Sequence, residues 1–466
     1  MIFSLRANLV SLHQSTFAAM LTNDTIVALS TPRGEGAIGV IRLSGEKSEE
    51  IVAKHIGNGI TKAESHSATF SRFQIGDKVL DEVVATIFRN PRSYTGEDVV
   101  ELSFHGSSYI LSQALEALIE SGARLAQPGE FTQRAFMNGK LDLSQAEAVA
   151  DLIASESEAE HKLAMHQMRG GFSDEINRLR EELINFASLI ELELDFGEED
   201  VEFANRDQLV SLVQKIQGFV QNLIESFRYG NAVKQGIPVA IIGKPNAGKS
   251  TLLNQLLNED RAIVSDIAGT TRDTIEDIAI IEGLKFRFID TAGLRDTDDD
   301  IEAQGVARSK QKMGSASIVL YLIDMSDVSE TENSVDEMRS DLNGASLIVV
   351  ANKSDLNAEK LPFVDLQISA KQGEGISELR SQLVRSIQAG NHAQGDVVVT
   401  NTRHLEALKA TATALEAALS GINSGLSGDL VASDIREALH QLGSITGEVT
   451  PDDLLGNIFS RFCIGK

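Results

Sequence analysis

The 466-residue chain has little cysteine, fewer cations than anions, and no long apolar run. Its one cysteine, Cys463, rules out an intrachain disulfide and excludes a secreted fold built on disulfides. Lys and Arg number 42 against 68 Asp and Glu, and the net charge of −26 disfavours non-specific binding to nucleic acid or to an anionic membrane. No apolar run is long enough to span a membrane. These features indicate a cytoplasmic protein, in which any nucleic-acid partner needs a local basic patch or the help of another protein.

The length of the chain predicts about three domains, and its hydrophobic texture changes along the sequence. We expect a leader, an N-terminal α/β domain, a helical segment, a nucleotide-binding domain and a second helical segment, over residues 1–20, 21–138, 139–235, 236–387 and 388–466. Because the helical texture returns after the nucleotide-binding domain, the simplest interpretation is one helical domain into which that domain is inserted. The predicted fold class is therefore α/β plus all-α.

Residues 1–20 contain a single arginine, Arg6, and no acidic residue. A targeting peptide is one interpretation, but one arginine is few for a mitochondrial signal, and no small-residue cleavage site follows a compact apolar core. We favour a short disordered leader, and a start at Met20 stays open as an alternative.

Regular elements are expected in both α/β domains. In the N-terminal domain, apolar runs bounded by turn residues predict strands at 26–29, 37–41, 83–88 and 99–104, and helical spacing predicts helices at 48–54 and 109–120. In the nucleotide-binding domain, alternating strands and helices predict a mostly parallel, doubly wound sheet. Its strands are expected at 239–242, 275–281, 286–289, 318–323, 347–350 and 366–368.

The helical segments carry apolar stripes that are expected to face a core. The first segment has two stripes, namely Leu179, Leu183, Phe186, Ile190 and Leu194, then Leu209, Leu212, Ile216, Phe219, Leu223 and Phe227. The second segment has two more, namely Leu405, Leu408, Leu415, Ala418 and Leu419, then Ile435, Leu439, Leu442 and Ile445.

The most informative motif is Gly-Lys-Pro-Asn-Ala-Gly-Lys-Ser at residues 243–250, between an apolar run and a helix-like run. This order of strand, glycine loop and helix is the context in which the pattern G-x-x-x-x-G-K-[ST] indicates a phosphate site. Successive backbone N–H groups make a nest for anionic oxygens, and the following helix adds its positive N-terminal end. Lys249 can reach the β- and γ-phosphates, and the Ser250 hydroxyl can hold Mg²⁺.

Three further motifs follow in the order that a GTP-binding domain needs. In residues 269–273 a threonine can complete the Mg²⁺ shell, and in residues 290–293 Asp290 can hold a Mg²⁺-linked water. In Asn-Lys-Ser-Asp at 352–355, the Asp355 carboxylate can accept two hydrogen bonds from guanine, whereas adenine would leave it unpaired. Residues 369–371 offer a backbone N–H to the guanine oxygen. Together these motifs predict GTP as the ligand.

The four motifs resemble those of the Era/EngA/TrmE class of GTPases, whose nucleotide domain is a Ras-like P-loop fold. The flanking sequences narrow the resemblance. Tyr-Thr-Gly-Glu-Asp at 94–98, the run at 128–143 and the ending Phe-Cys-Ile-Gly-Lys at 462–466 look like the MnmE (TrmE) family of tRNA modification GTPases. The resemblance extends from about Asn23 to the last residue, and the leader has no counterpart in it.

The resemblance implies that residues of all four motifs bind GTP. These are Asn246, Ala247, Gly248, Lys249, Ser250, Thr251, Ser265, Asp266, Ile267, Ala268, Gly269, Thr270, Thr271, Asp290, Thr291, Ala292, Gly293, Asn352, Lys353, Asp355, Ser369, Ala370 and Lys371. It implies Mg²⁺ on Ser250 and Thr271. It implies K⁺ on four further positions, Asn246, Ser265, Ile267 and Thr270, where the cation would neutralise charge that develops in the transition state, as an arginine finger does.

The resemblance also implies catalytic roles. Glu302 matches a carboxylate that orients the attacking water. Lys249 in the phosphate loop is a second catalytic position. A surface helix glutamate near an acidic loop is the alternative reading of Glu302. Pairing of two nucleotide domains would organise these groups.

The N-terminal domain resembles tetrahydrofolate-binding aminomethyl transferases, which implies a site for 5-formyltetrahydrofolate or a related one-carbon folate. The matching positions are Arg42, Glu97, Lys140 and Lys466. A carboxylate suits the donor-rich pterin, and cations suit the acidic glutamate tail. Without the resemblance, Arg42 and Lys140 would be read as surface charge. Cys463 is implied to take part in the modification chemistry, and a small buried apolar residue is the alternative.

The family is expected to form a homodimer through its N-terminal domain and a heterotetramer with the FAD-dependent protein MnmG, and to act on tRNA. This chain carries no Rossmann glycine fingerprint, so redox chemistry would come from that partner. The implied reaction adds a carboxymethylaminomethyl or aminomethyl group at carbon 5 of the wobble uridine of certain tRNAs. The alternative is a GTPase switch in ribosome assembly or RNA binding without modification chemistry, but it leaves residues 128–143 and 462–466 unexplained. A helical scaffold with a decayed GTPase is disfavoured because Lys249, Asp290 and Asp355 are intact.

Overall fold

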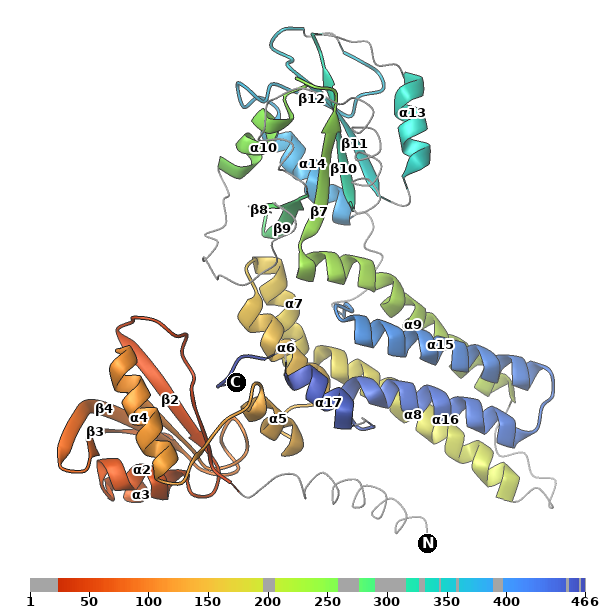
Figure 1. The fold of residues 1–466 in the computed structure, drawn as a ribbon. Helices are drawn as coiled ribbons and strands as arrows, with labels where there is room; N and C mark the ends of the chain where they lie inside the picture. Colours follow the sequence, from red (N-terminus) through yellow and green to blue (C-terminus); the bar gives the residue numbers. More distant parts are fainter. Residues whose placement is uncertain are drawn as a thin grey trace. The chain divides into compact units, whose positions relative to one another are not determined.

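The computed structural model describes residues 24–195, 206–258, 276–289, 316–326, 332–342, 345–357, 360–388, 397–449, 452–460 and 462–465. The chain forms two compact units (Figure 1). One unit comprises the described residues up to Ala150 together with those from Gly443 onward, and the other is Asp151–Leu442. The domain boundaries expected from the sequence stay a prediction.

The first unit is built on a six-stranded sheet with the order β3-β4-β5-β2-β1-β6. The strands are β1 (Ile26–Leu29), β2 (Ile38–Ser44), β3 (Ser67–Ile75), β4 (Lys78–Phe88), β5 (Val99–His105) and β6 (Arg124–Leu125). Neighbouring strands are antiparallel, except that β1 and β6 are parallel. One face packs against α2 (Ser48–Ile56), α3 (Gly59–Lys62) and α4 (Ser108–Glu120) (Figure 1). These helices bury apolar residues such as Ile51 and Leu118 against the strands. The strands and helices predicted in this domain are confirmed, whereas β3 and β6 were not predicted.

The other face of this sheet is covered at one end and open at the other. At the β1 end, Phe131 of α5 (Glu130–Met137) and Tyr94 pack on Ile26 and Ala28. At the β3 and β4 end, the cross-strand pair Phe70 and Val84 is 66% and 40% exposed. The strand register continues this row through Ser103 to Val40.

Two helices of the first unit pack against α5 and the segment that follows it. Leu143 of α6 (Leu143–Ala154) and Phe459 of α17 (Asp452–Phe459) share an apolar cluster. The chain then returns to α5, where Ile464 bridges to Pro128 as an isolated β-bridge. The C-terminal residues 462–465 therefore lie beside the run at 128–143.

The second unit contains long helices whose stripes pack together. They are α7 (Glu158–Met168), α8 (Gly171–Asp195), α9 (Arg206–Gln235), α15 (Thr402–Asn423) and α16 (Gly428–Thr446), the last of which extends into the first unit. Side-chain oxygens begin two of them, because Ser157 accepts from Glu160 N at 3.2 Å and Asn401 accepts from Arg403 N at 3.0 Å. The predicted stripes are buried at most of their described positions. On α9, however, Val213 and Val220 are buried where the prediction placed Leu212 and Phe219, so the core-facing stripe lies slightly to one side.

The second unit also contains a six-stranded sheet with the order β12-β11-β10-β7-β9-β8. Its elements are β7 (Ile237–Gly243), α10 (Lys249–Asn258), β8 (Asp277–Ile281), β9 (Leu284–Phe288), β10 (Ile318–Asp324), α13 (Glu332–Asp341), β11 (Ser346–Asn352), β12 (Leu366–Ile368) and α14 (Ile376–Gln388). The pairs are parallel, except that β8 and β9 form an antiparallel hairpin. Apolar residues of α10 and α14 cover one face, and those of α13 cover the other. The mostly parallel, doubly wound prediction is confirmed.

The helices and the second sheet share an apolar core. Ala232 and Val233 of α9 belong to the cluster of buried residues that α10 and α14 form with the strands. At the same junction, Lys285 of β9 pairs with Glu156 at 3.0 Å and with Glu160 at 3.5 Å. No helix in the described ranges is long and apolar enough to cross a membrane.

Candidate functional site

The predicted nucleotide residues lie at the carboxyl ends of parallel strands. The loop 243–248 follows β7, and Asp324 and Asn352 end β10 and β11. Ser369 comes directly after β12. Because ligands of open α/β sheets bind at this edge, the strand arrangement brings four separate sequence segments to one side of the sheet.

The phosphate loop has the backbone of an anion nest. Asn246 and Gly248 have φ of 61° and 93°, and α10 begins at Lys249. The Lys249 ammonium group donates to the carbonyls of Gly243 and Lys244 at 2.9 and 2.7 Å, so it lies over the loop where phosphates would bind. Asparagine tolerates a positive φ better than most residues. The positive φ is therefore sufficient to account for asparagine at position 246, and the role of Asn246 as a K⁺ ligand stays a prediction.

Asn352 ties the phosphate loop to the predicted guanine-binding loop. Its Nδ2 donates to the Ala247 carbonyl at 2.8 Å, and its Oδ1 accepts from Ala370 N at 3.0 Å. The Asn352 side chain is 2% exposed, so both contacts are shielded from water. The Ala370 N–H thus donates to Asn352 in this structure, and a guanine oxygen would have to share it or use a neighbouring N–H.

The acidic and basic members of the guanine motif are each held in place. Ser369 Oγ donates to Asp355 Oδ1 at 2.7 Å, which fixes the orientation of that carboxylate. Lys353 has a positive φ of 67° and pairs with Asp324 at 2.5 Å. Burial pushes the pKa of the Asp324 carboxyl upward, but hydrogen bonds from Lys353 and Ser326 hold it below its ordinary value. Asp324 therefore stays charged and anchors the Lys353 side chain, whose stem can pack on a base.

Several predicted nucleotide and metal residues lie outside the described residues. These are Ser265, Asp266, Ile267, Ala268, Gly269, Thr270, Thr271, Asp290, Thr291, Ala292, Gly293 and Glu302. Their roles stay predictions. Within the described ranges, no group of three or more His, Cys, Asp or Glu side chains is placed to hold a metal ion.

A second group of predicted residues gathers in the first unit, around Arg42 of β2. The Arg42 guanidinium lies 2.7 Å from Glu101 Oε1 and stands over the rings of Tyr94 and Phe131, at 5.5 and 5.8 Å from their centroids. Its side chain is 15% exposed, so it is not ordinary surface charge. Burial raises the pKa of the Tyr94 hydroxyl, which shares a hydrogen bond with Thr132. Phe131 is fully buried beneath the guanidinium and Tyr94 is partly exposed, so Arg42 and Tyr94 are the members of this cluster, which we call the Arg42 recess, that a flat, polar ligand could touch.

Glu97 and Lys140 lie next to this recess. Ser44, two residues from Arg42 on the same face of β2, donates to Glu97 Oε2 at 2.7 Å. The Lys140 stem packs near Gly96, where an added Cβ would lie 3.3 Å from its Cγ, and its Nζ donates to the Pro91 carbonyl at 2.9 Å. The structure therefore brings together three of the four predicted folate residues. Lys466 lies outside the described residues.

The C-terminal residues reach the same recess. Arg42 Nη1 donates to the Gly465 carbonyl at 3.4 Å, and Ser30 Oγ donates to it at 3.3 Å. Gly465 has a φ of 97°, and an added Cβ would lie 2.5 Å from the Leu29 carbonyl oxygen, so a larger residue would lift this segment away. Cys463 is exposed, which excludes the alternative of a buried apolar residue. Its chemical role stays a prediction.

Arg134 of α5 also belongs to this site and was not predicted from the sequence. Its side chain is 3% exposed, and its Nη1 lies 3.1 Å from Glu97 Oε2. Arg134 lies four residues after Glu130, which alone would indicate an exposed helical ion pair. The run at 128–143 that carried the family resemblance contained it, but only the fold shows that it faces Glu97.

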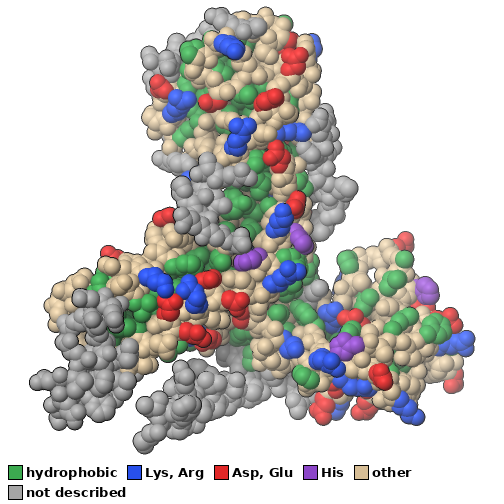
Figure 2. Space-filling view, turned by 180° about the vertical axis from the view of Figure 1, so that it is seen from behind, with side chains coloured by type: hydrophobic (Ala, Val, Ile, Leu, Met, Phe, Trp, Pro, Cys, Tyr) green, Lys and Arg blue, Asp and Glu red, His purple; other side chains and the backbone are tan. Residues whose placement is uncertain are grey.

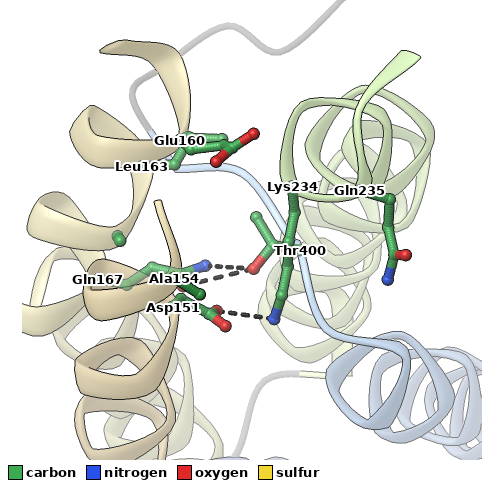
Figure 3. Close-up of a pocket in the computed structure, with 9 residues that line it drawn as sticks. Asp151, Ala154, Glu160, Leu163, Gln167, Lys234, Gln235 and Thr400 are labelled. Carbon is green, nitrogen blue, oxygen red and sulfur yellow. Dashed lines mark hydrogen bonds and ion pairs between the residues drawn. The ribbon is translucent and has the colours of Figure 1, made fainter. Parts of the chain in front are cut away.

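A cavity of about 170 Å³ lies elsewhere, among helices of the second unit (Figure 3). Lys234 pairs with Asp151 at 2.7 Å, and Gln167 Nε2 donates to Thr400 Oγ1 at 3.0 Å across it (Figure 3). None of the predicted site residues is among those that line it. The first contact joins α9 to Asp151 near the end of α6, and the second joins α7 to the segment before α15.

The charges of the described surface are mixed. On the face drawn in Figure 2, Lys and Arg side chains lie among Asp and Glu side chains and form no continuous basic field. Among the described residues, this face therefore offers no broad electrostatic track for a nucleic-acid backbone.

The doubly wound sheet, with a phosphate loop after β7 and a guanine motif after β11, defines a P-loop nucleotide-binding protein of the GTPase class. Residues 25–140 match the GTP-binding protein TrmE N-terminus, and residues 143–463 match the MnmE helical domain. The chain belongs to the MnmE (TrmE) family of tRNA modification GTPases, which confirms the resemblance found in the sequence.

Individual relatives match along nearly the whole chain. A tRNA modification GTPase MnmE of Cytophaga hutchinsonii is 53% identical over 459 residues, covering 97% of this chain and 100% of the relative. One of Christiangramia forsetii is 51% identical over 476 residues, covering 96% and 100%. Among solved structures, the G domain of the T. maritima FeoB iron transporter covers 32% of this chain and 98% of its own, at 22% identity and a TM-score of 0.23.

Proposed function

We propose that this chain hydrolyses GTP and couples hydrolysis to modification of tRNA in the cytoplasm. The observation that carries the GTP assignment is the position of Asp355, whose carboxylate is oriented by Ser369 beside the Asn352 bridge to the phosphate loop. A carboxylate held in this way can accept from guanine N1–H and the 2-amino group together. Mg²⁺ would be held by Ser250 and Thr271. K⁺ would be held by Asn246, Ser265, Ile267 and Thr270. Glu302 would orient the attacking water, and Lys249 would bind phosphate oxygens.

The modification that we propose is the addition of a carboxymethylaminomethyl or aminomethyl group at carbon 5 of the wobble uridine. The flavoprotein MnmG would supply the redox step, and a folate bound near Arg42 would supply the one-carbon unit. The recess supports the folate assignment because it combines a cation, a partly exposed aromatic ring and a carboxylate that suits a donor-rich pterin. Cys463 and Lys466 would complete it from the C-terminal segment, next to Gly465.

Two measurements test this function. GTP turnover is expected to fall by about 10²-fold when Na⁺ replaces K⁺, because a cation that fits the site stabilises developing phosphate charge. Steady-state hydrolysis in buffers of equal ionic strength gives the ratio, and equal rates in both ions would contradict the K⁺ site. In a deletion strain, nucleoside analysis of tRNA should show unmodified wobble uridines. Unchanged uridines there would contradict the modification but not the hydrolysis.

We further propose that two copies pair through the open face of the first sheet. Phe70 and Val84 form an exposed apolar pair there, in a row that leads toward the strand carrying Arg42. A symmetric interface uses the same patch on both copies, so one substitution acts twice.

Phe70→Lys is therefore expected to weaken the dimer by about 10²-fold or more, because each copy loses a buried aromatic ring and gains a charge. Sedimentation over a concentration series measures this. Val79→Lys is the matched control, since Val79 is 51% exposed at the tip of the same hairpin, outside the row. A Phe70→Lys chain that stays as dimeric as the Val79→Lys chain would rule out this face.

A further inference from the structure

Arg134 is a buried cation that contacts three carboxylates in the first unit. Its Nη1 lies 3.1 Å from Glu97 Oε2 and 3.3 Å from Glu97 Oε1. Its Nη2 donates to Asp24 Oδ1 at 2.7 Å and to Glu130 Oε1 at 3.1 Å. Burial alone would lower the pKa of Arg134, but the charges and hydrogen bonds of Glu97, Asp24 and Glu130 raise it. Arg134 is therefore a permanent charge in a fixed place.

The geometry of the network separates Glu97 from the other two carboxylates. Asp24 and Glu130 each contact a second guanidinium, that of Arg124, at 2.5 Å. Within the described part of the chain, no second cation contacts Glu97, and its carboxylate accepts instead from the Ser44 hydroxyl. The Glu97 side chain is 26% exposed, which is close to the 25% of Asp24 and above the 11% of Glu130. Two guanidinium groups face three carboxylates, so this ionic network carries a net charge of −1. Glu97 is the carboxylate of the network that lies beside Ser44 and the Arg42 recess.

The anchor of Arg134 is rigid. Its helix begins after Gly129, whose φ is 70° and where an added Cβ would collide with the Phe459 carbonyl. The Arg134 Nη1 also donates to the Asp24 backbone carbonyl at 3.0 Å. A guanidinium held by backbone and side-chain oxygens loses little further freedom when it binds another carboxylate.

We propose that Arg134 is the positioning residue for Glu97. By holding one edge of the carboxylate while Ser44 donates to Oε2, it turns the remaining lone pairs toward the recess, where they accept from the paired N–H donors of a pterin. This inference rests on the proposed folate site and deepens it, because it makes recognition of the 2-amino group depend on a residue that does not touch the ligand.

The test compares two ligands on the full-length chain by equilibrium dialysis. One is 5-formyltetrahydrofolate, and the other is its 2-desamino-2-methyl analogue, which lacks one donor to Glu97. The wild-type chain is expected to prefer the folate by about 10- to 100-fold, the usual value of a hydrogen bond to a charged group. Arg134→Lys is expected to reduce this preference by about tenfold, chiefly by weakening folate binding, since one ammonium cannot hold the carboxylate edge as a planar fork does.

Arg124→Lys is the matched control. Arg124 belongs to the same ionic network, but the carboxylates that it contacts among the described residues are those of Asp24 and Glu130 and not that of Glu97. The ligand preference of Arg124→Lys should equal that of the wild-type chain, even where its melting temperature falls. Melting temperature and GTP turnover, measured on all variants, show whether each chain is folded.

The outcomes separate the inference from the folate site. If Arg134→Lys lowers the affinity for both ligands equally, Arg134 has a structural role only, and the inference is overturned. An unchanged preference for the folate over its analogue would also overturn it. If Arg134→Lys does not fold, Glu97→Asp replaces it, because its shorter side chain cannot reach Arg134 and the ligand together and should lose the preference. A retained preference in Glu97→Asp would also overturn the inference. A wild-type chain that binds neither ligand would overturn the folate site and the inference with it.

Discussion

Asp355→Asn is expected to lower kcat/KM for GTP by about 10⁴-fold, because a site built to bind two N–H donors would face them with a donor of its own. Ser369 Oγ donates to Asp355 Oδ1 in the structure. An asparagine keeps that bond through its amide oxygen and so presents its NH₂ group to the base. Xanthine carries a carbonyl where guanine carries its 2-amino group. The same substitution should therefore increase turnover of XTP.

Steady-state hydrolysis of GTP and XTP by the two chains measures this exchange of specificity. Asp336→Asn is the control, since it is the same substitution on α13 of the same domain, at a side chain that is 60% exposed and pairs with Arg339 across the helix surface. Equal losses for both nucleotides would indicate a general defect and contradict the assigned role. Unchanged GTP turnover would show that the guanine base does not bind to Asp355.

The nucleotide domain was predictable because its central strands, β7, β10 and β11, are buried on both faces. Strands of this kind appear as continuous apolar runs, and β10 and β11 each end at a motif residue, Asp324 and Asn352. By contrast, β3 was not predicted, because it is a sheet edge with one uncovered face and alternates residues such as Phe70 and Arg72 without a clear apolar side. A strand such as β3, with apolar residues on an uncovered face, lacks the alternation of apolar and polar residues by which a strand is predicted from sequence.

The folate recess was predictable only through the family resemblance. Arg42 reads locally as strand-end charge, yet β5 pairing places it opposite Glu101 and α5 places Phe131 against it. Arg134 contacts Asp24 and Glu97, which are 110 and 37 residues away in sequence. A helical pattern reports spacings of three and four residues, so no local reading of α5 could show that this arginine is buried. The chemistry of such a site depends on long-range contacts that only the folded chain reveals.

Gly248→Ala tests the part of the nucleotide site that the loop sequence alone does not explain. A methyl group at this position would collide with Asn352 Nδ2, and the φ of 93° is one that alanine rarely adopts. The contact between Asn352 and Ala247 would open, and the two loops that flank the nucleotide would separate. We expect GTP affinity to fall by about 10²- to 10³-fold, because an opened buried hydrogen bond and a strained loop each cost about 1–3 kcal/mol.

Titration with a fluorescent GTP analogue measures this loss. Gly425→Ala is the matched control, because Gly425 also has a positive φ, 70°, but has no heavy atom within 4 Å of the added Cβ. It carries backbone strain without the collision and should bind GTP normally. If the two alanine variants bind GTP equally well, the approach of Asn352 to residue 248 is not what requires glycine in this loop. If only Gly248→Ala fails, the glycine is required by the side chain that joins phosphate recognition to guanine recognition, as well as by the turn it makes.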